Sequence, residues 1–136
     1  MIGALDTSKS ALIAQRIRLD VIAGNMANAE VTRQEDGTIE PYRRRFVTFM
    51  TGDGQGGPGV HVDEVREDPS SFRLQYAPHH PDRIRYGPYA DYVQLPNVNI
   101  TMEYVDALEA SRAYEANAAM LEVTKRMLQQ ALRLFA

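Results

Sequence analysis

Cysteine is absent from this chain of 136 residues, and uninterrupted apolar segments are scarce. Without cysteine there is no disulfide framework, no thiolate nucleophile and no cysteine-ligated zinc. The longest apolar run near the N-terminus covers only residues 11–14, too little for the apolar core of a signal peptide. No segment approaches the roughly 20 apolar residues of a membrane span. These absences are typical of a cytosolic protein, unless a different export route carries it.

A surplus of positive charge is also missing. Fifteen Lys and Arg residues stand against 18 Asp and Glu residues, which gives a net charge of −3. Nucleic-acid-binding proteins of this size usually carry a concentrated basic surplus, so we expect no nucleic-acid partner. Arg outnumbers Lys 13 to 2, and Arg favours the planar, hydrogen-bonded contacts found at interfaces.

Helix breakers are missing from both ends of the chain. All seven prolines lie between Pro41 and Pro96, and seven of the nine glycines lie between Gly37 and Gly87. Proline costs a helix interior about 3 kcal/mol. This distribution therefore predicts a helix, a β-rich insert and a second helix.

The expected fold class is α+β, with a coiled-coil-like helical core. Its helices would cover 1–30 and 99–136 and form one helical domain. The β-rich insert would cover 31–98 and include a flexible Gly-rich loop at 52–59. Alternating or β-branched and aromatic residues predict strands in this insert, at 42–50, 60–63, 72–76 and 89–95.

Apolar residues recur every seven positions in both expected helices, a spacing that forms a seam along one side of a helix. A polar residue on such a seam can fix its register. The predicted interface and helical-core residues are Leu5, Leu12, Leu19, Ile22 and Met26 in the first helix and Tyr114, Asn117, Leu121, Leu128 and Phe135 in the second.

The second helix is long for a domain of this size, roughly 50 Å if it covers 101–134. Asn99 or Thr101 can cap its start. Its expected partner is the first helix, in parallel or antiparallel orientation. Its apolar surface also includes Met120, Val123 and Met127, which is more than one partner can cover. Part of this surface should therefore meet other chains.

Two patterns resemble ligand sites, but each has a simpler interpretation. Gly52, Gly54 and Gly57 satisfy G-x-G-x-x-G, yet Pro58 and Gly59 follow where the phosphate-binding helix should begin, which favours a loop. A second pattern could supply metal ligands but is better interpreted as a rigid turn, because Pro78 and Pro81 constrain it; its residues are His79, His80 and Asp82, with the distant His61.

Each charged cluster could likewise have a chemical role, but a structural interpretation is simpler. Neighbouring carboxylates, such as Asp63 with Glu64, generally point apart into water and do not form an acid–base pair. The basic run 43–45 lies beside Tyr42 and Phe46, which is conceivable for single-stranded nucleic acid. An interface or a salt-bridged strand is the favoured interpretation. We therefore expect no catalytic residue, cofactor or metal.

Eight segments of the chain share their residues with one known family. They are 8–12 (SKSAL), 14–16 (AQR), 18–21 (RLDV), 25–29 (NMANA), 41–44 (PYRR), 76–82 (YAPHHPD), 95–99 (LPNVN) and 110–117 (ASRAYEAN). The N-terminal segments resemble the motif shared by the bacterial flagellar axial proteins, the family of rod, hook and hook-associated subunits, and the later ones resemble its proximal rod proteins. The resemblance covers most of the chain and is weakest between residues 50 and 60.

The resemblance implies a structural subunit of the proximal rod, the drive shaft that transmits motor torque and encloses the export channel. Implied partners are other rod proteins, further copies of the chain in a helical assembly, and the MS ring and export-gate components at the rod base. The implied location is periplasmic, after export through the flagellar type III apparatus without a cleaved signal peptide. A soluble helical adaptor or export chaperone is the alternative, and an enzyme of unrecognised type is a third.

Overall fold

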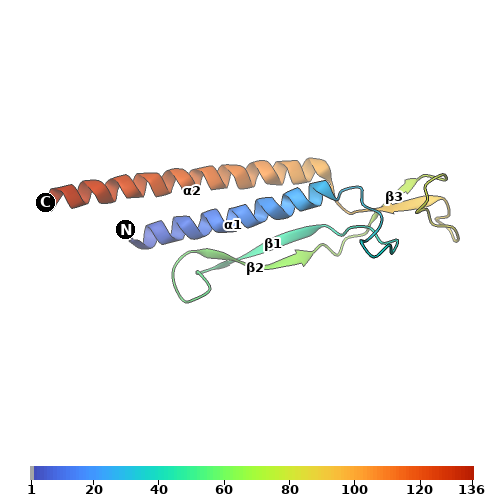
Figure 1. The fold of residues 1–136 in the computed structure, drawn as a ribbon, viewed down its shortest axis with the longest axis horizontal. Coiled ribbons are helices and arrows are strands. Elements are labelled where there is room, and N and C mark those ends of the chain that lie inside the picture. The colour runs from blue at the N-terminus through green and yellow to red at the C-terminus, as the bar shows by residue number, and fades with distance from the viewer. Residues whose placement is uncertain (1) are drawn as a thin grey trace.

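The two proline-free ends of the chain form the longest elements of the structure. The computed structural model describes residues 2–136, and the α+β class is confirmed, with two long helices and a small β-rich middle region. Figure 1 shows an elongated molecule in which β3 and β4 project from one end. The elements, in chain order, are α1 (Ile2–Ala27), β1 (Arg45–Thr51), β2 (Val60–Glu67), β3 (Arg73–Tyr76), β4 (Tyr92–Leu95) and α2 (Ile100–Leu134).

Helix α2 begins directly after Asn99, one of the two caps that the sequence predicts. The Asn99 Oδ1 accepts hydrogen bonds from the backbone N–H groups of Thr101 at 3.1 Å and Met102 at 3.3 Å. These bonds satisfy two of the N–H groups that lack a partner at the start of any helix. The helix then continues for 35 residues without a break.

The two helices run antiparallel, so both ends of the chain lie at the same end of the molecule (Figure 1). Asn25, late in α1, contacts Glu103, early in α2, while Arg18 pairs with Glu109 at 3.6 Å. This register places the start of α1 opposite roughly residue 125 of α2. Residues 125–136 therefore extend beyond α1, and we name them the α2 overhang.

Small and polar side chains line the face of α2 that meets α1. Glu103, Ala110 and Thr124 are buried, and the half-buried Asn117 lies between them at the same seven-residue spacing. The short side chains of Ala110, Asn117 and Thr124 allow the two helices to approach closely. The half-buried Leu121 lies beside this row.

Helix α1 lies between α2 and the hairpin formed by β1 and β2 (Figure 1). It therefore has two covered faces, and Ala14, Ile22 and Asn25 are its buried residues. The hairpin is antiparallel, with a register shift between Thr48 and Phe49. Such a bulge increases the local twist of the pair, and here the twisted hairpin follows α1.

Strands β3 and β4 form a second antiparallel pair, in which Arg73 lies opposite Leu95. The expected strand at 89–95 is shorter in the structure and begins at Tyr92, because Asp91 has a positive φ of 69° that interrupts the extended chain. The expected strand at 42–50 likewise begins only at Arg45, because the residues before it bind other parts of the molecule.

Candidate assembly interface

The ten predicted interface residues divide into covered and exposed positions. Ile22 is buried, and seven others are half-buried within the chain, namely Leu5, Leu12, Leu19, Met26, Asn117, Leu121 and Leu128. Tyr114 and Phe135 are 38% and 91% exposed. Eight of the ten are therefore at least partly covered within the chain, and Leu128 and Phe135 lie in the overhang.

A second apolar row on α2 has no cover within the chain. Met120, Met127 and Leu134 recur every seven residues and are 58%, 53% and 85% exposed; we name them the outer stripe. Large exposed apolar surfaces are typical of protein contact sites. Neither helix is apolar enough to cross a membrane, as judged over residues 2–136.

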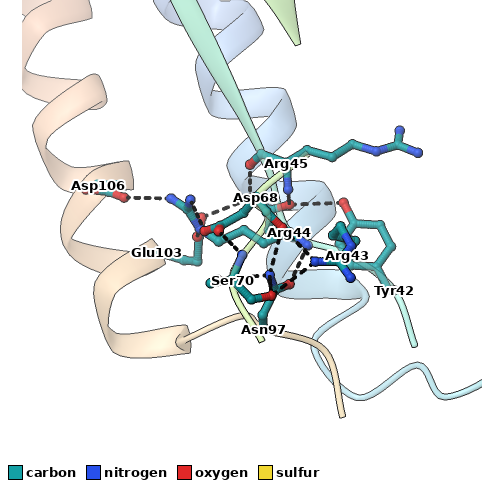
Figure 2. A network of polar contacts seen from close by, with 10 residues as sticks. Tyr42, Arg43, Arg44, Arg45, Asp68, Ser70, Asn97, Glu103 and Asp106 are labelled. Carbon is teal, nitrogen blue, oxygen red and sulfur yellow. Dashed lines mark hydrogen bonds and ion pairs between the residues drawn. The ribbon is translucent and has the colours of Figure 1, made fainter. Parts of the chain in front are cut away.

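A polar cluster joins the start of α2 to the segment before β1, and Arg44 lies at its centre (Figure 2). Its Nε donates a short hydrogen bond to Glu103 Oε1. Its Nη1 donates to Asp68 Oδ2 at 3.2 Å, and its Nη2 lies 3.7 Å from Asp106 Oδ2. The Arg44 backbone N–H donates to Asn97 Oδ1 at 2.8 Å. One side chain thus links three segments, and we name this cluster the polar junction.

Asn25 connects the polar junction to α1. Its Oδ1 accepts from the Arg45 backbone N–H at 2.9 Å and from the Tyr42 hydroxyl at 3.0 Å. Its Nδ2 donates to the Arg45 carbonyl at 2.6 Å and to Glu103 Oε2 at 3.2 Å. The side chain is fully buried, and all of its hydrogen-bonding groups have partners, which a buried amide requires. Asn25 therefore bonds both the N–H and the carbonyl of Arg45, the first residue of β1, as the backbone of a neighbouring β-strand would.

The charges of the polar junction stabilise one another. Burial by itself lowers the pKa of Arg44, but the hydrogen bond and the charge of Glu103, with a contribution from Asp68, raise this pKa above its usual value. Hydrogen bonds from Ser70 and Arg44 hold the pKa of Asp68 below its usual value. Burial raises the pKa of the Tyr42 hydroxyl. Arg44, Asp68 and Tyr42 thus keep their neutral-pH charge states.

A second polar contact joins the segment between β3 and β4 to the chain that follows α1. Asp82 is buried, and it accepts hydrogen bonds of 2.6 Å from both the Thr32 hydroxyl and the Arg33 Nε. The hydrogen bond from Thr32 lowers the pKa of Asp82, and the bond and charge of Arg33 lower it further. The β3–β4 pair is therefore positioned by the chain that leaves α1.

The residues considered as chemical sites take part in turns. The Gly52 N–H donates to the Gly59 carbonyl at 2.7 Å and closes the loop between β1 and β2. His80 Nδ1 accepts from the Asp82 backbone N–H at 3.0 Å. Within residues 2–136, no three His, Asp or Glu side chains converge to hold a metal ion. Of the basic run 43–45, Arg44 forms ion pairs, as the salt-bridge interpretation predicts.

Sequence reasoning missed the polar junction as a unit. It gave Glu103 no partner and placed Asn25, Tyr42 and Asn97 in three separate segments of the chain. The available signal was the position of Glu103, seven residues before Ala110, on the side of α2 that faces its partner. A charge in that row requires an ionic partner, and the basic run 43–45 could supply one.

These features define a class of protein, an elongated helical structural subunit with uncovered apolar surface along its longest helix. The comparisons identify the family. A model described as flagella basal body rod protein matches residues 5–33, and one described as flagellar basal body rod FlgEFG protein C-terminal matches residues 90–134.

Full-length relatives agree with these two matches. The flagellar basal-body rod protein FlgC of Bacillus subtilis is 41% identical over 96% of this chain and 95% of its own length. The FlgC protein of Borreliella burgdorferi is 38% identical over 97% of this chain and 95% of its own length. The FlgC protein of Salmonella typhimurium is also 38% identical, over 98% of this chain and 97% of its own length. The chain belongs to the FlgC family of flagellar basal-body rod proteins.

Proposed function

We propose that this chain is a structural subunit of the proximal rod of the flagellar basal body and polymerises through its helices. The outer stripe on α2 carries the proposal, because Met120, Met127 and Leu134 stay exposed beside the row of α2 that faces α1. Packing such a row against a neighbouring subunit removes apolar surface from water, at roughly 25 cal/mol per Å².

The polar junction suits a subunit that transmits torque. Torque in a drive shaft applies shear to its subunits. Two helices joined only by small side chains could slide along each other under that shear. Arg44 and Asn25 connect α2, α1 and the hairpin through charged and buried hydrogen bonds, which are stronger than neutral, exposed ones. The subunit would therefore deform less under load than a bare helix pair.

The finer parts of the proposal follow from the family. The subunit would contact other rod proteins and further copies of itself, and would meet MS-ring and export-gate components at the rod base. The assembled helices would enclose the export channel. The chain would reach the periplasm through the flagellar type III apparatus, would act as a scaffold and not as an enzyme, and would bind no nucleic acid.

Electron microscopy of basal bodies tests this function. Cells that lack the gene should produce rings without a rod or hook, and a plasmid copy of the intact gene should restore both. Complete basal bodies in the deletion strain would refute a required axial role and would favour the alternative, a soluble helical adaptor or export chaperone.

A further inference from the structure

The α2 overhang is the largest part of the helix pair without a partner. Leu132, Leu134 and Phe135 are 62%, 85% and 91% exposed. The overhang is also basic, since Lys125, Arg126 and Arg133 are its only charged side chains. An exposed, apolar and basic helix end is complementary to a recess that is apolar and carries negative charge.

The same chain offers a recess of that kind on the opposite side of α1. A groove of about 310 Å³ lies between the first half of α1 and the loop end of the hairpin. Its apolar lining includes Ile13, Ile17, Val60 and Val62, and Asp53 lies at its edge. Ile13 remains 54% exposed, so the hairpin leaves part of this lining uncovered.

The charges of the two surfaces are complementary. Asp53 is the carboxylate among the residues that line the groove, and the loop 52–59 that carries it has no cationic side chain. The overhang carries three cations and no acidic side chain; one of the three, Arg126, also pairs with Glu122 on the preceding turn of α2. Hydrogen bonds from the Gln55 and Gly57 backbone N–H groups lower the pKa of Asp53, so this carboxylate is charged at neutral pH. Complementary charge favours association of the correct faces.

We propose that the α2 overhang of one copy packs into the groove of a second copy. This contact deepens the proposed rod function and depends on it. The overhang cannot reach the groove of its own chain, because α1 separates α2 from the hairpin (Figure 1). A groove of this size accepts a few side chains and not a whole helix, so Leu134 and Phe135 at the helix end are the anchors.

The geometry of this contact has a consequence for assembly. The overhang and the groove are different surfaces. Each copy would therefore place its overhang in one neighbour and receive the overhang of another neighbour in its groove. Such heterologous contacts continue from copy to copy and produce helices or rings, whereas self-complementary contacts stop at a dimer. A head-to-tail contact of this kind would let consecutive copies join around the rod axis.

Disulfide cross-linking in isolated basal bodies tests the contact, because the chain has no cysteine of its own. Ile13→Cys combined with Leu134→Cys should produce disulfide-linked dimers and larger multimers after mild oxidation. Within one chain the register separates these two positions by roughly 30 Å of helix, far beyond disulfide reach. The matched control is Gln75→Cys with Leu134→Cys, since Gln75 is exposed on β3, and it should give no multimers.

The outcomes separate this contact from the rod function. Motile cells with intact rods but no multimers from the 13/134 pair would overturn the contact and leave the rod role standing. If the double variant fails to assemble, a photoreactive phenylalanine derivative in place of Phe135 gives the second readout. A cross-link to residues 10–17 or 53–62 of another copy supports the proposal, and a cross-link to a different basal-body protein overturns it.

Discussion

At the residue scale, Glu103 is the point where three segments meet. It is 1% exposed, and its two carboxylate oxygens bind Arg44 and Asn25. Arg44 reaches it from the chain before β1, and Asn25 from α1. A buried carboxylate is tolerated only when it is paired and hydrogen-bonded, so Glu103 is stable only where these segments come together.

Glu103→Gln should lower the free energy of unfolding by roughly 3 kcal/mol, the usual cost of breaking a buried ion pair. The amide of Gln would turn one N–H toward Arg44 or the Asn25 Nδ2, both of which are donors. The matched control is Glu109→Gln, because Glu109 is 68% exposed and lies 3.6 Å from Arg18, and this change should cost less than about 1 kcal/mol. Chemical denaturation of both purified variants measures the difference, and equal losses would contradict the role of the junction.

Acid should weaken the polar junction through Asp68. Its pKa in the folded protein lies below the usual 3.8, so its contribution to stability is full above that value and disappears as the pH falls through the folded pKa. Asp68→Asn should therefore reduce stability at pH 7, by no more than about 1 kcal/mol for a partly solvated group. The difference from the unmodified protein should shrink as the pH falls below 3.8 and through the lower pKa of the folded protein. Denaturation curves across this range test it, and a constant difference would argue against the assignment.

At the element scale, the hairpin is attached to α1 at both of its ends. Asn25 holds the start of β1. At the other end, the Ser10 hydroxyl accepts a hydrogen bond of 3.1 Å from the Val60 backbone N–H. The close approach there depends on Gly59, which has a φ of 128° and no side chain to collide with α1. The two attachments set the orientation of the hairpin along the helix.

Gly59→Ala should detach the loop end of the hairpin from α1. A Cβ at this position would lie 3.1 Å from the Ser10 Cβ and closer still to its hydroxyl, so the Ser10 bond to Val60 would be lost. Gly56→Ala is the control, because Gly56 also has a positive φ, of 91°, but has nothing within 4 Å; it should cost only about 1 kcal/mol of backbone strain. Hydrogen exchange of the β1 and β2 amides should increase in the first variant alone. Equal protection in both would show that Ser10 does not hold the hairpin.

At the scale of the whole molecule, the apolar residues of α2 divide between folding and assembly. Leu121 and Leu128 are partly covered by the chain, whereas Leu134 is almost fully exposed. The predicted seam along the helix pair and the uncovered outer stripe are adjacent rows of one helix. Substitutions in these rows should therefore have different effects on the isolated protein and on the rod.

Leu134→Asp should leave the free energy of unfolding within about 0.5 kcal/mol of the unmodified value. It should nevertheless prevent incorporation into the rod, because it places a charge in a desolvated contact. Leu121→Asp should block incorporation and also destabilise the isolated protein, by roughly 2–4 kcal/mol, because Leu121 is half-buried in the part of α2 that lies beside α1. Denaturation of the purified variants and their content in isolated basal bodies give the two readouts. Normal swimming of the Leu134→Asp strain would refute the assembly role of the overhang.

The sequence by itself determined the elements, because their signals are local. The confinement of proline to 41–96 predicts the two helices, and alternating or β-branched and aromatic residues predict the four strands of the insert. The cap at Asn99 is local as well, since its bonds reach only two and three residues ahead. The membership in the rod family is also visible in the motifs of the chain.

Only the tertiary structure decided how these elements meet. The antiparallel register of α1 and α2, the position of the hairpin and the polar junction all depend on residues far apart in sequence, such as Arg44 and Glu103, which are 59 positions apart. Seven-residue spacing shows which side of a helix is apolar but not which partner covers it. That choice is made by packing and by the pairing of buried charges, and both exist only after the chain has folded.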